Sequence, residues 1–80
     1  MDLLATLEFY LTPKGEKYLG SMEQVGLAFI VLTCLDSGPK ILGDIIAYAQ
    51  DSQDIYSPWY VREYLKRLME LDLVDYGEVE

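Results

Sequence analysis

Apolar and polar residues alternate strictly over the segment from Ala5 to Leu11. A period of two places successive side chains on opposite faces, which is typical of a strand with one buried face. One face holds Ala5, Leu7, Phe9 and Leu11, and the other holds Thr6, Glu8 and Tyr10. We therefore predict that this segment forms a strand.

A short helix is predicted directly after this strand. Thr12 offers a side-chain oxygen as the N-cap, and Pro13 suits the first helical position because its fixed φ fits a helix. Gly20 favours an end to the helix at that point. We expect a helix from Pro13 to Leu19.

The most apolar segment, from Met22 to Leu35, is predicted to form a central helix. Ser21 and Gln24 have the spacing of a capping box at its start, and a polar turn with Gly and Pro follows it. Cys34, within the segment, is expected to behave as a small buried hydrophobe. Because apolar residues occupy nearly every side, the helix must be covered all round. We predict that a second subunit supplies part of that cover, in a homodimer through this helix.

The second half of the chain is predicted to hold a short extended piece, two helices and a strand. These are Lys40–Ile41, Asp44–Gln50, Pro58–Leu71 and Leu73–Tyr76, respectively. The polar residues from Asp51 to Asp54 are interpreted as a turn. Ser57 and Pro58 give the next helix a strong start signal, and Tyr56 and Val61 have the spacing of a hydrophobic staple.

The predicted helix from Pro58 to Leu71 divides into two faces at the helical period. The inward arc holds Val61, Tyr64, Leu65, Leu68 and Met69, and the outward face holds Trp59, Tyr60, Arg62, Glu63, Lys66, Arg67 and Glu70. Three cations against two carboxylates give this helix a charge of +1, in a chain whose net charge is −8. Glu63 and Arg67 have the i, i+4 spacing of an attractive pair.

Composition limits the function classes. The chain has no histidine and one cysteine, which removes the usual zinc ligand sets and the Ser-His and Cys-His catalytic pairs. We therefore expect no enzyme activity, no metal and no cofactor. We expect residues 1–80 to form a single cytoplasmic domain, because no leader is evident and one cysteine cannot form an internal disulfide. No apolar run reaches the ~20 residues of a membrane span.

The order helix, short strand, helix, capped helix, strand resembles a winged helix-turn-helix domain of the transcription-regulator type. The segment Tyr64–Val74 is similar to the recognition helix running into the first wing strand. The segment Leu11–Leu19 is similar to the region that follows the last wing strand in many repressors of this family, yet here it comes first. The resemblance implies a mainly α, α+β fold with circularly permuted order: three main helices, a short N-terminal helix, and a wing that pairs the N- and C-terminal strands.

The resemblance also implies that the third main helix lies in the major groove of double-stranded DNA. Tyr60, Glu63 and Arg67 would then face bases, and Ser57, Arg62 and Lys66 would face phosphates. Two alternatives follow from the acidity of the chain. In one, the domain binds a protein partner through Trp59 and Tyr60, because aromatic residues dominate interface hot spots. In the other, the acidic surface mimics DNA and inhibits a nucleic-acid-binding protein.

Overall fold

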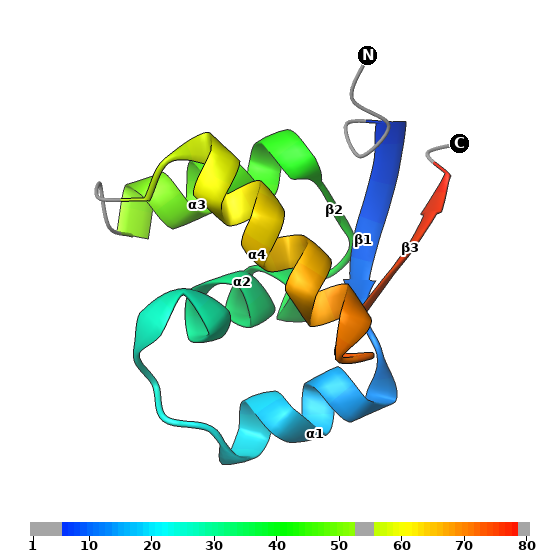
Figure 1. Ribbon diagram of the computed structural model, residues 1–80. Helices are drawn as coiled ribbons and strands as arrows, with labels where there is room; N and C mark the ends of the chain where they lie inside the picture. The colour runs from blue at the N-terminus through cyan, green and yellow to red at the C-terminus, as the bar shows by residue number, and fades with distance from the viewer. Residues whose placement is uncertain (1–5, 53–55, 79–80) are drawn as a thin grey trace.

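Helices predominate in the computed structural model, which describes residues 6–52 and 56–78 (Figure 1). In chain order, the elements are β1 (Leu7–Leu11), α1 (Pro13–Ser21), α2 (Gly26–Asp36), β2 (Lys40–Ile41), α3 (Leu42–Ser52), α4 (Pro58–Glu70) and β3 (Val74–Glu78). The predicted mainly helical α+β class is confirmed. In these two ranges, no helix is both long enough and apolar enough to cross a membrane.

Within the described residues, the sheet has three antiparallel strands in the order β2-β1-β3. β3 pairs along all of β1, from Leu7 opposite Glu78 to Leu11 opposite Val74, whereas β2 pairs at only two positions. The predicted pairing between the first and last strands is therefore confirmed, although β3 begins and ends later than predicted. Ala5 of the predicted first strand lies outside the described residues.

The core forms where the helices cover one face of the sheet. Phe9 on β1 is fully buried, whereas Tyr10 is exposed, as the alternation predicts. α2 occupies the middle of the molecule (Figure 1) and contacts α1, α3, α4 and β1. Its buried side chains are Leu27, Ile30, Val31, Leu32, Cys34 and Leu35. Most of the cover that α2 requires therefore comes from its own chain.

The start of α2 differs from the prediction. The helix begins at Gly26 rather than Met22, and the predicted capping box of Ser21 and Gln24 is wrong. Ser21 instead ends α1, where its hydroxyl donates to the Tyr18 carbonyl oxygen at 3.2 Å and therefore does not cap the next helix. Gly26 has a φ of +89°, which a right-handed helix cannot continue through.

Other boundaries shift by smaller amounts. α1 continues past the predicted end at Leu19, and α4 ends at Glu70. α3 begins at Leu42 and includes Asp51 and Ser52, which were expected in a turn. The remainder of that predicted turn lies outside the described residues. The two helix starts that carried Ser or Thr followed by Pro are both confirmed.

Candidate functional site

Helix α4 presents the residues predicted to bind a partner, and its start is held by local hydrogen bonds. The Ser57 hydroxyl accepts from the Tyr60 N–H at 3.1 Å, and the Ser57 carbonyl oxygen accepts from the Val61 N–H at 3.1 Å. The inward arc is as predicted, with Val61, Leu65 and Leu68 buried. Packing of this arc fixes which side chains of α4 face outward.

The first turn of α4 exposes two large aromatic side chains. Trp59 is 67% exposed and Tyr60 is 46% exposed. Tyr60 is also the middle ring of an aromatic row, with its centroid 6.1 Å from that of Tyr56 and 6.2 Å from that of Tyr64. Tyr56 thus stacks on Tyr60, and it also packs against the hydrophobic core, to which Val61 belongs. The row holds Tyr60 in place beside the more exposed Trp59.

The charged residues on the outer face of α4 are mostly paired with one another. The Glu63 Oε2 atom lies 2.8 Å from the Arg62 guanidinium and 3.1 Å from the Lys66 ammonium. The expected pair of Glu63 with Arg67 is not formed, because the carboxylate binds these two nearer cations instead. One carboxylate therefore offsets much of the positive potential of two predicted phosphate-binding residues.

The remaining cations come from different elements of the fold. Lys40, on β2, donates to the Ser37 hydroxyl at 3.1 Å and to the Gly38 carbonyl oxygen at 3.2 Å. Lys14 and Lys17 share an exposed face of α1. Among the described residues, neither of these two lysines nor Arg67 forms a salt bridge. The structure therefore distributes the positive charge over three elements.

Burial raises the pKa values of two side chains near these elements. Burial raises the pKa of the Tyr64 phenol, and the neighbouring Tyr60 and Tyr18 add to the shift while Arg67 opposes it. Burial likewise raises the pKa of the Cys34 thiol, with Lys40 opposing and Asp44 adding to it. Both groups are therefore uncharged near neutral pH, and Cys34 is the buried hydrophobe that the sequence predicts.

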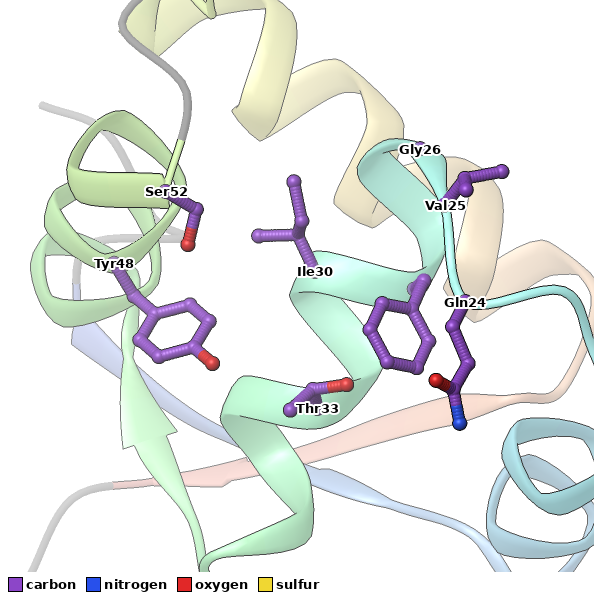
Figure 2. A pocket seen from close by; sticks show the side chains of 8 residues that line it. Gln24, Val25, Gly26, Ile30, Thr33, Tyr48 and Ser52 are labelled. Carbon is purple, nitrogen blue, oxygen red and sulfur yellow. The ribbon is translucent and has the colours of Figure 1, made fainter.

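A shallow groove, which the sequence did not predict, lies between α2 and α3. Its volume is about 300 Å³. Figure 2 shows Tyr48 and Ser52 of α3 facing Ile30 and Thr33 of α2 across this groove, with Val25 at its rim. The lining combines apolar side chains with hydroxyl groups. Such a groove depends on how two helices pack, and the periodicity of either helix alone does not reveal it.

Metal-ligating side chains do not gather in residues 6–52 and 56–78: no group of three or more histidine, cysteine, aspartate or glutamate residues is placed to hold an ion. Comparisons of the chain with protein-family models, curated proteins and solved structures found no match.

Proposed function

We propose that this chain is a permuted winged-helix domain that binds a protein partner through the aromatic start of α4. The pairing of β1 with β3 supports the permuted fold. It brings the first and last described strands together, and a wing built from the two ends of the chain requires such a pairing. The short β2 on the other side of β1 completes the sheet.

The exposure of Trp59 is the observation that carries the proposed function. Its indole is 67% exposed on a rigid, capped helix, beside the partly exposed ring of Tyr60. Exposed tryptophan and tyrosine side chains supply large contact areas with little loss of rotamer freedom, and they are enriched at interface hot spots. We infer that Trp59 is the anchor and that Tyr60 flanks it.

Charge favours a protein over DNA as the partner of this helix. Affinity for duplex DNA comes largely from cations that replace counterions at phosphates. On α4, Glu63 already binds Arg62 and Lys66, and the chain as a whole carries −8. A phosphate backbone approaching this face must compete with the Glu63 carboxylate for both cations.

The test uses Trp59 as its own reporter, because it is the single tryptophan of the chain. Partners are captured from a lysate of the source organism with the wild type, Trp59→Ser and Leu71→Ser, and each captured protein is then purified and titrated. Leu71 is the control because it is an exposed apolar residue at the other end of α4. We expect a blue shift of the Trp59 emission when the wild type binds. Calorimetric titration, which needs no tryptophan, should show that Trp59→Ser abolishes binding and Leu71→Ser retains it. A purified partner that binds both variants equally well would contradict the proposal.

DNA binding remains a second candidate. It is supported by Arg67 on α4 and by Lys14 and Lys17 on α1, which are exposed and form no salt bridge within the described part of the chain. It predicts salt-sensitive binding of labelled duplex DNA, measured by fluorescence anisotropy, that is lost when Arg62, Lys66 and Arg67 are all replaced by alanine. If this binding is found and no protein partner depends on Trp59, the DNA candidate replaces the first.

A further inference from the structure

Strand β3 lies at the edge of the sheet, and one side of it is open. β1 lies between β3 and β2, and the main contacts of β3 are with β1 and with α4, the helix that leads into it (Figure 1). Among the described residues, no strand pairs with the other side of β3. A free strand edge presents main-chain N–H and C=O groups to solvent, and such an edge can accept an added strand.

The register of the sheet shows which main-chain groups of β3 point to the free edge. The Thr12 N–H donates to the Leu73 carbonyl oxygen at 3.2 Å, which continues the β1–β3 ladder. Because hydrogen-bonded positions alternate along an antiparallel ladder, Asp75 and Gly77 bond towards β1, and Tyr76 points to the free edge. The Tyr76 N–H donates instead to the Asp75 Oδ1 atom at 2.8 Å. The carboxylate of the preceding residue therefore occupies the donor that an added strand would use.

The free edge of β3 is acidic. Residues 71–78 hold three carboxylates, Asp72, Asp75 and Glu78, and no lysine or arginine. Asp75 and Glu78 are exposed, and neither forms a salt bridge within residues 6–52 and 56–78. Like charges directly opposite each other destabilise a pair of strands, so the acidic β3 of a second copy is a poor match for this edge. The charge of the edge instead fits a basic segment.

The two faces of β3 specify where the side chains of such a segment would lie. Tyr76 is 51% exposed, and its ring centroid lies 6.5 Å from that of the buried Phe9, on the face that the helices cover. Asp75 lies on the opposite face, because successive side chains of a strand alternate. An added strand therefore matches β3 when an apolar residue lies beside Tyr76 and a basic residue lies beside Asp75.

We propose that β3 binds a basic, extended segment of another protein, which adds to the sheet as a strand along the free edge. A main-chain carbonyl of that segment replaces the Asp75 carboxylate at the Tyr76 N–H, and the released carboxylate pairs with a lysine or arginine of the segment. An apolar residue of the segment covers Tyr76. Asp75 selects for a basic partner, because a segment without a cation would leave this carboxylate without its present hydrogen bond. The binding does not depend on the function proposed for α4.

Titration of the protein with a short synthetic peptide that alternates lysine and valine tests the proposal, with amide hydrogen exchange followed by NMR. We expect exchange to slow at Val74 and Tyr76, whose N–H groups face the free edge, and to change little at Asp75 and Gly77, which β1 already pairs. The same peptide with proline in place of its central valine keeps the charge but cannot pair along the edge, so it should not protect these amides. Absence of binding, or equal binding of both peptides, would overturn the proposal.

Variants of Asp75 test the predicted charge pair. Asp75→Asn keeps a side-chain acceptor for the Tyr76 N–H but removes the charge, and we expect it to bind the lysine–valine peptide about two- to fivefold more weakly. Asp51→Asn is the matched control, because it removes the same charge from an exposed position at the end of α3, which lies away from β3 (Figure 1). It should bind as the wild type does. Equal affinities of the two variants would contradict the role of Asp75.

Variants of Tyr76 test the main-chain contact. Tyr76→Pro removes the outward N–H but leaves the hydrogen bonds to β1 in place, as proline on an edge strand can. With an unchanged circular dichroism spectrum, it should bind the peptide about tenfold more weakly than Tyr76→Ala, which loses the ring alone. Equal binding of these two variants would overturn strand addition. Trp59→Ser should bind the peptide as the wild type does, which separates this edge from the surface proposed on α4.

Discussion

The Thr12 hydroxyl donates a hydrogen bond to the main-chain carbonyl oxygen of Asp72 at 2.6 Å, across 60 positions of sequence. The same Thr12 oxygen accepts from the Gly15 N–H at 2.9 Å, so one side chain both caps α1 and joins it to the turn between α4 and β3. The Thr12 N–H also donates to the Leu73 carbonyl oxygen at 3.2 Å. Asp72 adopts a φ of 63°, which directs the chain from α4 into β3. This junction links the first helix of the chain to its last strand.

Replacement of Thr12 by valine should destabilise the fold. Valine keeps the shape of threonine but removes the hydroxyl, which leaves the Asp72 carbonyl oxygen and the Gly15 N–H without this partner in a buried place. We expect the free energy of unfolding to fall by about 1–3 kcal/mol, measured by urea denaturation. Thr12→Ser keeps the oxygen and should lose less. Equal losses in the two variants would show that the hydroxyl has no special role.

The same substitution at two glycines of α1 should have opposite effects. A Cβ at Gly15 would overlap the Leu73 carbonyl oxygen, so Gly15→Ala must push α1 away from the turn before β3. We expect a loss of about 1–3 kcal/mol in the free energy of unfolding. Gly20 has open space around it, and Gly20→Ala should gain about 0.4–1 kcal/mol because alanine restricts the unfolded chain. Thermal unfolding, monitored by circular dichroism, shows which variant is less stable than the wild type and which is more stable.

Replacement of Glu63 by glutamine should release Lys66 to interact with phosphate, and it removes one partner of Arg62. Because the salt bridges of Glu63 to Arg62 and Lys66 are partly exposed, the free energy of unfolding should change by less than about 1 kcal/mol. We expect tighter binding to duplex DNA than in the wild type and a steeper dependence on salt, by about 0.9 in the slope for each additional phosphate that the protein neutralises.

Glu70→Gln is the matched control for this measurement, because it removes the same charge from an exposed position of the same helix. Anisotropy titrations of both variants at several salt concentrations separate the effect of the lost salt bridges from the effect of the changed net charge. If both variants bind DNA more tightly by the same factor, then net charge alone is responsible and the salt bridges of Glu63 are irrelevant to DNA binding.

Stability should decrease at alkaline pH because of Cys34. Burial raises the pKa of its thiol above the ordinary value of 9.0, so the unfolded chain loses the thiol proton first as the pH increases. The stabilisation is therefore complete below pH 9.0 and declines as the pH rises from 9.0 towards the higher value in the folded protein. Cys34→Ala cannot ionise at this position, and its free energy of unfolding should fall less over the same interval. Urea titrations between neutral and alkaline pH provide the measurement.

Because of Tyr64, the free energy of unfolding of Cys34→Ala should still depend on pH in the alkaline range. The pKa of its phenol is also raised by burial, from an ordinary value of 10.0, so it destabilises the fold at still higher pH by the same reasoning. In the double variant with Tyr64→Phe and Cys34→Ala, the free energy of unfolding should fall still less as the pH rises. An unchanged pH profile in the double variant would contradict the assignment to these two groups.

Local signals in the sequence predicted a helix start correctly where the capping side chain forms its hydrogen bond within the helix that it starts. Thr12 with Pro13, and Ser57 with Pro58, begin α1 and α4 as expected, because a cap bonds within the next three residues. The same type of signal failed at Ser21. There the preceding helix offered carbonyl acceptors to the hydroxyl, and the conformation of Gly26 set the start of α2.

In the candidate site, too, some features could be predicted from the sequence pattern and others could not. Periodicity predicted which side of α4 faces outward, since burial of Val61, Leu65 and Leu68 follows from the helical repeat. Periodicity could not select the partner of Glu63, because Arg62, Lys66 and Arg67 are all within reach of one carboxylate. The groove beside Val25 was beyond prediction for a related reason, since it requires the relative placement of two helices.

The sequence by itself therefore determined the class of the fold, the order of the elements and the buried faces of β1 and α4, because these follow from the residue pattern within each segment. The pairing of β1 with β3 was expected only from the resemblance to a permuted winged helix. Only the tertiary structure decided the docking of α1 on the Asp72 turn, the salt bridges of Glu63 and the α2–α3 groove. These features depend on side chains that meet through packing of the whole domain, and a local pattern contains no information on which of several possible partners will be closest.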